Sequence, residues 1–228
     1  EATILKTLSL ILPVRNEAEL IQAQLQQLQC YRASGHEIIL VDGGSEDGTV
    51  EQAQGLVDRC ELAAAGRSTQ MNLGASVARG DVLLFLHADT ELPSTVDERI
   101  SDALTSQSCR WGWFDVRLSK PRPAFRLIAW MMNWRSRLTS VATGDQALFV
   151  ESGLFNEIGG FPALPLMEDI AISKLLRRLG RPARTSGLAT TSSRRWEENG
   201  LISTVLLMWR MGFIYFIVGE SLRFGWAY

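Results

Sequence analysis

The chain has 228 residues, of which 46% are hydrophobic and 21% are charged, and its formal net charge is −2 at pH 7. This composition excludes a disordered tail, a collagen-like chain and a disulfide scaffold. The near-neutral total hides an uneven distribution. Residues 1–109 carry 16 acidic and 7 basic side chains, whereas residues 110–228 carry 9 and 16, together with all seven tryptophans. Unless this split is ordinary surface charge, the two halves meet different partners.

The cysteines indicate a reducing compartment. Cys30, Cys60 and Cys109 are an odd number with no C-x-x-C spacing, which argues against a disulfide framework and against a zinc site. The apolar run at residues 8–14 is too short for the hydrophobic region of a signal peptide, and no cleavage site follows it. We therefore expect a cytoplasmic protein.

The first half alternates strand and helix patterns. The apolar, β-rich runs predict strands at residues 7–14, 38–41 and 82–86, and the helical spacings predict helices at residues 17–28, 49–59 and 71–79. This alternation predicts a parallel sheet with right-handed crossovers. Ligands bind such sheets at the carboxyl ends of the strands.

A polar cluster follows each predicted strand of the first half. The clusters are Arg15-Asn16-Glu17, the acidic loop at residues 42–47, and His87-Ala88-Asp89. Three coinciding clusters indicate a ligand site at this edge, the alternative being that loops are simply polar. The second half is less regular, with a predicted strand at 111–118, a helix at 124–138, a strand at 146–150 and a helix at 168–179.

The loop from Asp42 to Thr49 is acidic and rich in glycine. Glycine lets the backbone approach a ligand closely, and a carboxylate accepts hydrogen bonds from a base or from ribose hydroxyls. The loop lacks the glycine patterns of dinucleotide-binding and P-loop proteins. It is therefore either a nucleotide-binding loop of another kind or an ordinary turn.

Three further clusters each have two interpretations. Asp89 can bind Mg²⁺ or Mn²⁺ whose other ligands are diphosphate oxygens and waters, and His87 is either a second ligand or a packing residue. The pair Glu168-Asp169 begins a predicted helix, so it is either a cap or holds a general base for an acceptor hydroxyl. The run at residues 194–196, Arg-Arg-Trp, is either a phosphate site or a basic surface.

Taken in order, these segments resemble a family 2 glycosyltransferase of the GT-A fold over about residues 7–200. The resemblance implies an α/β protein with a single, mostly parallel sheet flanked by helices and a C-terminal helical extension. It is closest to a bacterial subgroup labelled arsenosugar-biosynthesis or radical-SAM-associated glycosyltransferases. The matching segments are residues 12–17, 41–49, 66–67, 70, 72–74, 78–81, 85–90, 144–146, 159–161, 168–169 and 194–196.

The resemblance implies a role for each matching residue. Asp169 would be the base of an inverting transfer, and Asp89 would bind the metal on the donor diphosphate. The nucleotide base and ribose would be surrounded by Pro13, Asn16, Glu17, Asp42 and Arg67. The acceptor or diphosphate side would be formed by Gly144, Asp145, Glu168, Arg194, Arg195 and Trp196.

Two positions depart from the family pattern. Gly43 stands where the family usually has a second aspartate, and His87 begins the D-x-D motif, so that Asp89 is its single carboxylate. Metal charge and arginines would still stabilise the departing nucleoside diphosphate. Asp169 would still need only to reach the acceptor hydroxyl.

The implied function is transfer of a sugar from a nucleoside-diphosphate sugar to a hydroxyl group, with inversion and with Mn²⁺ or Mg²⁺. The acceptor is unidentified, a lipid-linked one being an option, and no nucleic-acid partner is implied. One rival is a sugar nucleotidyltransferase, which usually has a glycine-rich N-terminal loop that residues 12–17 lack. The other is a non-catalytic nucleotide-binding or membrane-associated scaffold of the same fold.

The predicted organisation is a GT-A domain at residues 1–200, with a donor half at 1–109 and an acceptor half at 110–200, and an apolar helical extension at 201–228. Residues 201–219 are apolar apart from Arg210. As a helix they would span about 28 Å, close to a bilayer core. A central arginine costs at least about 2.5 kcal/mol in a spanning helix. A helix on the inner membrane surface, in a homodimer or in the core fits better.

Overall fold

The computed structural model describes residues 5–198. The chain forms two compact units, Glu1–Thr191 and Ser192–Tyr228. The described part of the second unit contains one short helix, α8 (Arg194–Glu198). The predicted apolar extension at residues 201–228 lies outside the described residues. Of the described helices, none is long and apolar enough to cross a membrane.

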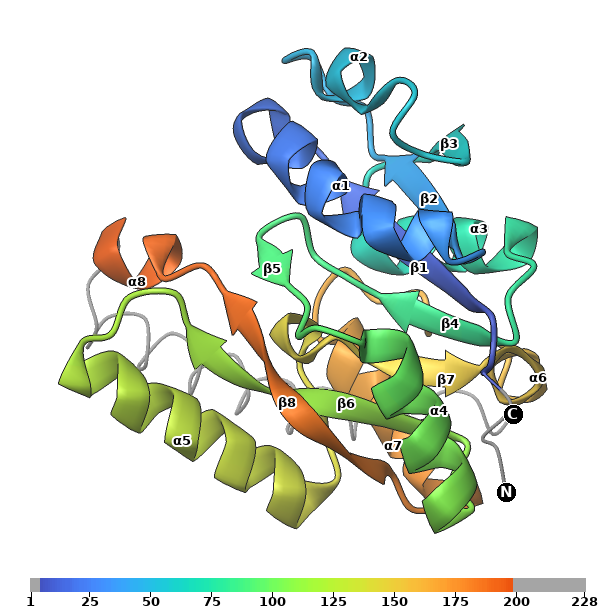
Figure 1. Cartoon of the computed structure of the whole chain (residues 1–228), viewed down its shortest axis with the longest axis vertical. Helices are drawn as coiled ribbons and strands as arrows, with labels where there is room; N and C mark the ends of the chain where they lie inside the picture. Colours follow the sequence, from blue (N-terminus) through green and yellow to red (C-terminus); the bar gives the residue numbers. More distant parts are fainter. Residues whose placement is uncertain (1–4, 199–228) are drawn as a thin grey trace, which may run out of the picture. The chain divides into compact units, whose positions relative to one another are not determined.

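The first unit contains one eight-stranded sheet with the spatial order β3-β2-β1-β4-β7-β6-β8-β5 (Figure 1). Its strands are β1 (Leu8–Val14), β2 (Glu37–Asp42), β3 (Arg59–Leu62), β4 (Val82–Phe85), β5 (Thr90–Glu91), β6 (Trp111–Leu118), β7 (Phe149–Glu151) and β8 (Ala183–Thr191). The helices are α1 (Ala18–Ala33), α2 (Thr49–Ala53), α3 (Arg67–Val77), α4 (Val96–Gln107), α5 (Pro123–Thr139), α6 (Ser152–Glu157) and α7 (Glu168–Leu179), with the single 3₁₀ turn η1 (Gly144–Gln146).

The sheet is mostly parallel. Strands β1 to β4 pair in parallel, as do β6 and β8. Strand β7 lies antiparallel between β4 and β6, and β5 is antiparallel to β8. Because β7 is antiparallel to both of its neighbours, β6 runs in the same direction as β4. The carboxyl ends of β1, β2, β4, β6 and β8 therefore lie at one edge, which is where the sequence predicts the ligand site.

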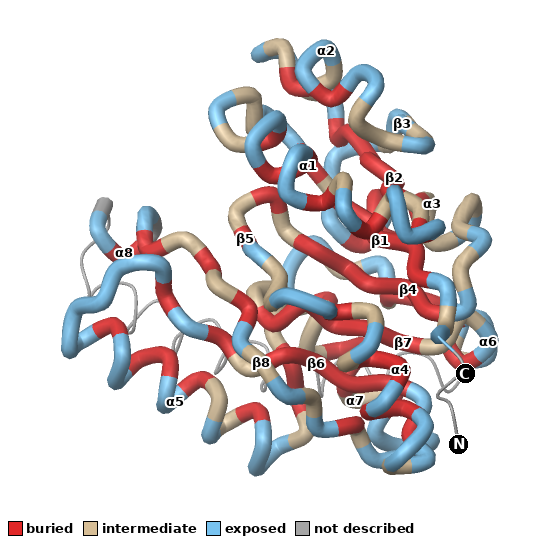
Figure 2. Tube along the Cα trace, in the orientation of Figure 1, coloured by how far each residue is buried: buried red, intermediate tan, exposed pale blue. Residues whose placement is uncertain are grey.

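Apolar side chains cover both faces of the sheet. On one face a buried cluster joins Met71 of α3, Phe155 of α6 and Ile172 of α7 to Ile11 and Phe85 of the strands. Helices α1 and α4 lie on the other face, in front of the sheet in Figure 1. Figure 2 shows the buried residues running along the central strands. Burial of each large apolar side chain contributes about 1.5–3 kcal/mol, so the sheet is a rigid support for its edge.

Several predicted elements are confirmed, and others end at different residues. The strand at 111–118 and the helix at 168–179 have the predicted bounds. The helix predicted at 49–59 ends at Ala53, just before Gly55, whose φ of 76° is a left-handed conformation that favours glycine. The strand predicted at 146–150 occupies Phe149–Glu151, because η1 takes the residues before it.

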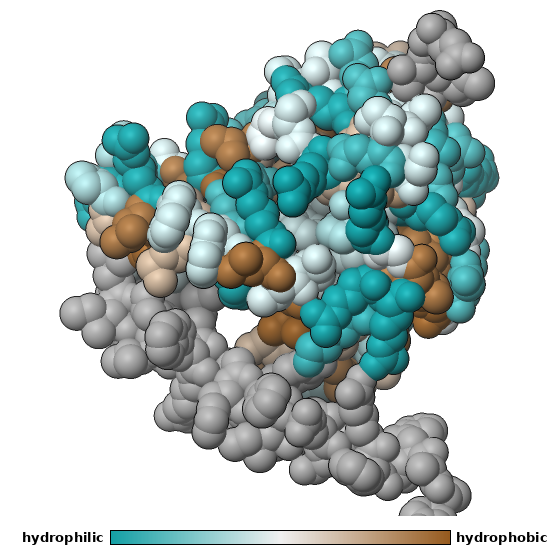
Figure 3. Space-filling model, turned by 90° about the horizontal axis from the view of Figure 1, so that it is seen from below, coloured by the Kyte–Doolittle hydropathy of each residue, from teal (hydrophilic) through white to brown (hydrophobic). Residues whose placement is uncertain are grey.

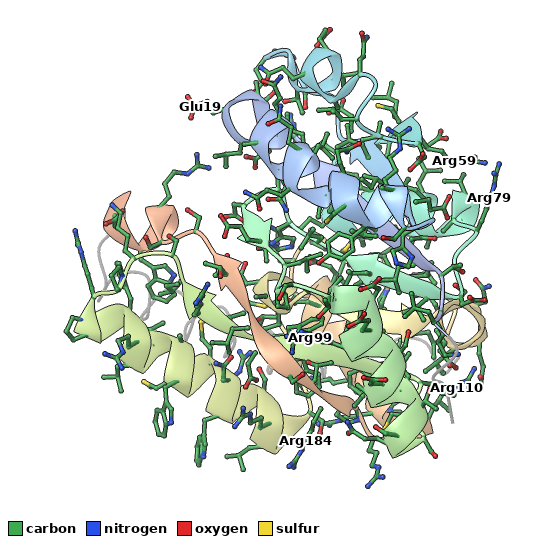
Figure 4. All side chains as sticks on the ribbon, viewed as in Figure 1. Glu19, Arg59, Arg79, Arg99, Arg110 and Arg184 are labelled. Atoms are coloured by element: carbon green, nitrogen blue, oxygen red, sulfur yellow. The ribbon has the colours of Figure 1, made fainter. Side chains whose placement is uncertain are left out.

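Seven of the described elements were not predicted, namely β3, β5, α4, η1, α6, β8 and α8. Strand β8 is typical, since it carries threonine, serine and glycine in place of an apolar run. It is held from both sides, by β6 through the ladder and by α4 through a hydrogen bond from Arg99 Nη1 to Ser186 Oγ (2.7 Å) (Figure 4). Its position therefore depends on partners distant in the sequence, which a local pattern does not show.

Helix α5 is amphipathic and lies along β6. The Asn133 side chain accepts a hydrogen bond from Val116 N (2.8 Å) and donates one to Val116 O (2.9 Å), so the helix is fastened to the strand backbone. Trp130 and Trp134 are exposed on its outer side and stack with ring centroids 6.2 Å apart. Seen from below, brown hydrophobic side chains interrupt the teal surface of the molecule (Figure 3). The bounds of α5 confirm the helix predicted at residues 124–138.

We expect Gly80→Ala to destabilise the fold by about 1–3 kcal/mol, the usual cost of overpacking. A Cβ atom at position 80 would lie 2.6 Å from Ser9 Oγ and 2.7 Å from Ser9 N, so it would push against the backbone of β1. The matched control is Gly180→Ala, because a Cβ there would have no heavy atom within 4 Å. Urea unfolding measures both, and equal changes in the two variants would contradict the prediction.

Candidate functional site

The loops that follow β1 and β2 are joined by hydrogen bonds. Asn16 donates its backbone N–H to Ser45 Oγ (2.8 Å), and its Oδ1 accepts from Glu46 N (2.9 Å). Asn16 has a φ of 55°, a left-handed conformation that asparagine adopts more readily than most residues. The structure therefore brings the first two predicted polar clusters together at the carboxyl edge of the sheet.

Asp42 shapes its own loop. Its side chain is buried, and Oδ2 accepts hydrogen bonds from the N–H groups of Gly44 and Ser45, both at 2.9 Å. Oδ1 accepts a third bond from the Ser45 hydroxyl. This is the ordinary-turn interpretation of the loop. Three of the roughly four acceptor positions of the Asp42 carboxylate are thus used within the loop itself.

Asp47 and Thr49 are additional fastening residues that the sequence interpretation did not single out. Asp47 accepts hydrogen bonds from Ala18 N (3.0 Å) and Thr49 N (3.1 Å). A bond from the Thr49 hydroxyl, with these backbone bonds after it, lowers the pKa of the carboxyl group. Thr49 Oγ1 accepts from Glu17 N (2.9 Å). The starts of α1 and α2 are therefore held together, and with them the predicted nucleotide residue Glu17.

Gln70 of α3 joins the ends of β1 and β2 from inside the protein. Its Nε2 donates to Val14 O and Val41 O, both at 2.8 Å, and the side chain is only 4% exposed. A Cβ atom at position 43 would lie 3.0 Å from Gln70 Nε2. This close approach gives a physical reason for Gly43, because a larger side chain there would require Gln70 to shift. Pro13, the remaining predicted residue of this region, lies on β1 opposite Val41.

A second polar group forms around Gly144. The Gly144 N–H donates to Asp169 Oδ2 (2.9 Å), and Asp169 Oδ1 accepts from Ile170 N (2.8 Å). His87 Nδ1 lies 3.4 Å from Asp145 Oδ1. Position 144 has no room for a side chain, because a Cβ there would lie 2.4 Å from His87 Cε1. The end of β4, the η1 turn and the start of α7 thus meet at one point.

Glu168 differs from its neighbour Asp169 in its surroundings. It is 5% exposed, and burial raises its pKa above the ordinary value, as does the adjacent Asp169 carboxylate, while Arg67 and His87 oppose the rise. Arg67 begins α3 and is exposed, and its Nη1 would lie 3.6 Å from a Cβ at position 144. The Arg67 side chain therefore lies beside Gly144 and near Glu168.

Asp89 lies in the turn between β4 and β5. Within the described residues its carboxylate takes part in a single long hydrogen bond, 3.4 Å from Thr90 Oγ1. Across the same part of the chain, no group of three or more His, Cys, Asp or Glu side chains could hold a metal ion. A metal here would therefore need most of its ligands from the donor and from water.

The remaining predicted residues lie in the second unit. Helix α8 contains Arg194, Arg195 and Trp196, of which Arg194 is exposed and Trp196 is buried. A separate cavity of about 730 Å³ opens at the amino ends of β6 and β8, at the sheet edge opposite the polar groups described above. It contains none of the predicted residues and is lined by Gln107, Trp113, Asp115, Arg137, Ser140 and residues 181–185.

Comparisons with known proteins connect this geometry to a family. Glycosyltransferase AglE of Haloferax volcanii is 38% identical over 90 residues, which is 36% of this chain and 30% of that protein. Dolichol-phosphate mannosyltransferase of Pyrococcus furiosus is 28% identical over 107 residues, which is 44% of this chain and 30% of that protein.

A solved structure has the same fold. The mannosyltransferase PcManGT of Pyrobaculum calidifontis, in complex with GDP-Man and Mn²⁺, matches with a TM-score of 0.61 at 21% identity, covering 83% of this chain and 57% of that one. This likeness confirms the predicted GT-A fold. Each match covers less than two thirds of the relative's length. The model of glycosyl transferase family 2 matches residues 9–154, more than half of the chain. The protein therefore belongs to glycosyl transferase family 2.

Proposed function

We propose that the protein transfers a sugar from a nucleoside-diphosphate sugar to a hydroxyl group of an acceptor. The observation that carries the proposal is the hydrogen bond from Gly144 N–H to Asp169 Oδ2, which holds a carboxylate beside the end of β4. That position is the ligand edge of an open parallel sheet. Membership of the family and the bound donor of PcManGT support the same chemistry.

The donor nucleotide would bind to the joined loops after β1 and β2. These loops are held by Gln70, Asp47 and Asp42, so their backbone needs little ordering when the ligand binds. Such preorganisation reduces the entropic cost of binding. Pro13, Asn16 and Glu17 would contact the base and ribose from β1 and the loop that follows it.

Asp89 fits a divalent cation at the donor diphosphate. Among the described residues, its carboxylate is engaged only by the 3.4 Å contact with Thr90, so its oxygens are available to a hard cation. When bound, Mn²⁺ or Mg²⁺ supplies charge that stabilises the departing diphosphate. His87 directs its Nδ1 to Asp145, so only its Nε2 could serve as a further ligand. The Mn²⁺ of PcManGT supports a metal in this fold.

Asp169 would act as the general base. Its two oxygens each accept a backbone N–H bond, and these bonds fix the direction in which the carboxylate faces. A base that removes the acceptor proton during a single displacement gives inversion at the sugar carbon. Glu168 is the poorer candidate, because its burial favours the protonated form, which cannot take up a proton. Two adjacent carboxyl groups in different surroundings thus have different tasks.

The finer features of the proposal follow from the sequence resemblance. The arsenosugar or radical-SAM-associated subgroup stays a prediction, as do a cytoplasmic location, a lipid-linked acceptor and a membrane or dimer contact through residues 201–228. The acceptor would approach Gly144, Asp145 and Glu168. Arg194, Arg195 and Trp196 are proposed for the acceptor or diphosphate side on the same ground.

Replacing the proposed base should stop the transfer and leave donor binding intact. We expect Asp169→Asn to lower kcat by about two to four orders of magnitude, the range attributed to general base catalysis. Asparagine keeps the size and the hydrogen-bond acceptor that faces Gly144. The measurement is release of nucleoside diphosphate from a panel of sugar nucleotides and acceptors, with nucleotide binding followed separately by calorimetry.

The control for this variant is Glu157→Gln, which removes an exposed carboxylate of α6 that pairs with Arg110. It should keep the wild-type rate. Transfer by Asp169→Asn at a rate near wild type would show that Asp169 is not the base.

Removal of the Asp89 carboxylate should weaken metal-dependent nucleotide binding. We expect Asp89→Ala to raise the Kd for GDP or UDP with Mn²⁺ by about tenfold or more, since a bond to a charged group contributes about 1.5–3 kcal/mol. Binding without metal should change little. The matched control is Asp102→Ala, an exposed aspartate on α4. The assignment fails if the two variants respond alike to Mn²⁺.

Burial of Glu168 should make stability depend on pH. Because its pKa in the folded protein is raised above 4.5, the folded state holds this proton more tightly than the unfolded state. Below pH 4.5 the Glu168 carboxyl group is protonated in both states, so its contribution to stability is fully present there. The free energy of unfolding falls as the pH rises from 4.5 through the raised pKa. We therefore expect the Tm of Glu168→Gln, relative to the Tm of the wild type, to increase from pH 4.5 to pH 7. A constant difference over this range would contradict the raised pKa.

A further inference from the structure

We propose that Arg135 and Gln146 form a subsite for an anionic group of the acceptor, a phosphate or carboxylate, beside Asp169. This inference rests on the proposed function, because it assigns a substrate class to the acceptor side of the same site. Neither residue was singled out for this role by the sequence, where Arg135 is one of several arginines on a helix.

The two side chains belong to one hydrogen-bonded group. Arg135 Nη2 donates to Ser136 Oγ (3.1 Å), and that hydroxyl donates to Gln146 Oε1 (2.8 Å). Ser136 and Gln146 are fully buried. The group therefore links the last turns of α5 to the η1 turn, whose Gly144 holds Asp169.

The group contains buried donors without acceptors. Thr143 N donates to Gln146 Oε1 (3.0 Å), so the amide orientation is fixed and its Nε2 faces the other way. Within the described residues, Gln146 Nε2 and Arg135 Nε are the buried side-chain polar atoms with no hydrogen-bond partner. Native proteins rarely leave buried donors uncompensated. These two donors therefore lack an acceptor, which the oxygens of a bound group or a water would supply.

Charge indicates what kind of group this is. Arg135 forms no ion pair with the described residues, whereas Arg137, two residues later, pairs with Asp115. Burial lowers the pKa of the Arg135 guanidinium, and the nearby Asp169 carboxylate opposes this effect. The half-buried side chain remains partly open to solvent. An incoming anion can thus reach a guanidinium that no carboxylate already neutralises.

The donor set selects an anion over a neutral hydroxyl or a cation. A guanidinium and an amide NH₂ group offer only N–H donors, and a guanidinium fits the paired oxygens of phosphate or carboxylate. The positive charge would also offset repulsion between the bound anion and Asp169. An acceptor that carries its hydroxyl near an anionic group would then present that hydroxyl to Asp169.

Inorganic phosphate is the probe for this subsite. The full chain is saturated with GDP or UDP and Mn²⁺, so that phosphate does not enter the donor site, and phosphate binding is measured by calorimetry and by the rise in Tm. We expect Arg135→Gln to weaken phosphate binding by about tenfold or more, in line with loss of a charged hydrogen bond. The matched control Arg137→Gln should bind phosphate as the wild type does.

A second variant distinguishes loss of the subsite from misfolding. Gln146→Glu places a carboxylate in the buried group and should also abolish the phosphate response, while the Tm without phosphate shows whether each variant folds. Unchanged phosphate binding in Arg135→Gln overturns the inference, and so does a wild type that binds no phosphate, since water alone then completes the group. Arg135-dependent phosphate binding by a protein that neither binds nor turns over sugar nucleotides would contradict the proposed function and not the anion subsite.

Discussion

The hydrogen bond from Gly144 N–H to Asp169 Oδ2 is the constraint on which the candidate site depends. It joins residues 25 apart in the sequence and fixes the start of α7 against the η1 turn. A Cβ at position 144 would collide with the His87 ring, so a larger residue there would require that ring to shift. The glycine therefore lets the end of β4 and the proposed base come close together.

The sheet topology explains why this meeting occurs at the ligand edge. Strand β7 runs antiparallel to β4, with Leu84 opposite Phe149, and Phe85 N donates to Leu148 O (2.9 Å). An antiparallel strand starts where its neighbour ends. The turn immediately before β7 therefore lies beside the carboxyl end of β4, although the chain reaches it through α4, β6 and α5. A purely parallel sheet would place that turn at the opposite edge, far from Asp89.

Patterns in the local sequence predicted the strands and helices whose formation depends on the spacing of their own residues. The apolar runs of β1, β2 and β4 and the period of α5 and α7 are visible in the sequence, and so is the edge at which polar residues gather. Strand β8 was missed because its small polar residues are held by distant partners. The anion subsite proposed for Arg135 and Gln146 was not predicted for a similar reason, since burial and an absent partner are properties of the packed structure and not of spacing.

The charge split in the sequence corresponds to two ways of binding an anion. The donor half presents carboxylates at its edge, such as Asp89, so a diphosphate can approach there only with a cation that neutralises both. The proposed acceptor half presents Arg135, which forms no ion pair with the described residues, so an anionic group could bind there directly. Under the proposed function the reacting hydroxyl would lie between these two regions, at Asp169. Because the Arg135 guanidinium lies near Asp169, its positive charge would offset part of the negative charge that both substrates bring to this carboxylate.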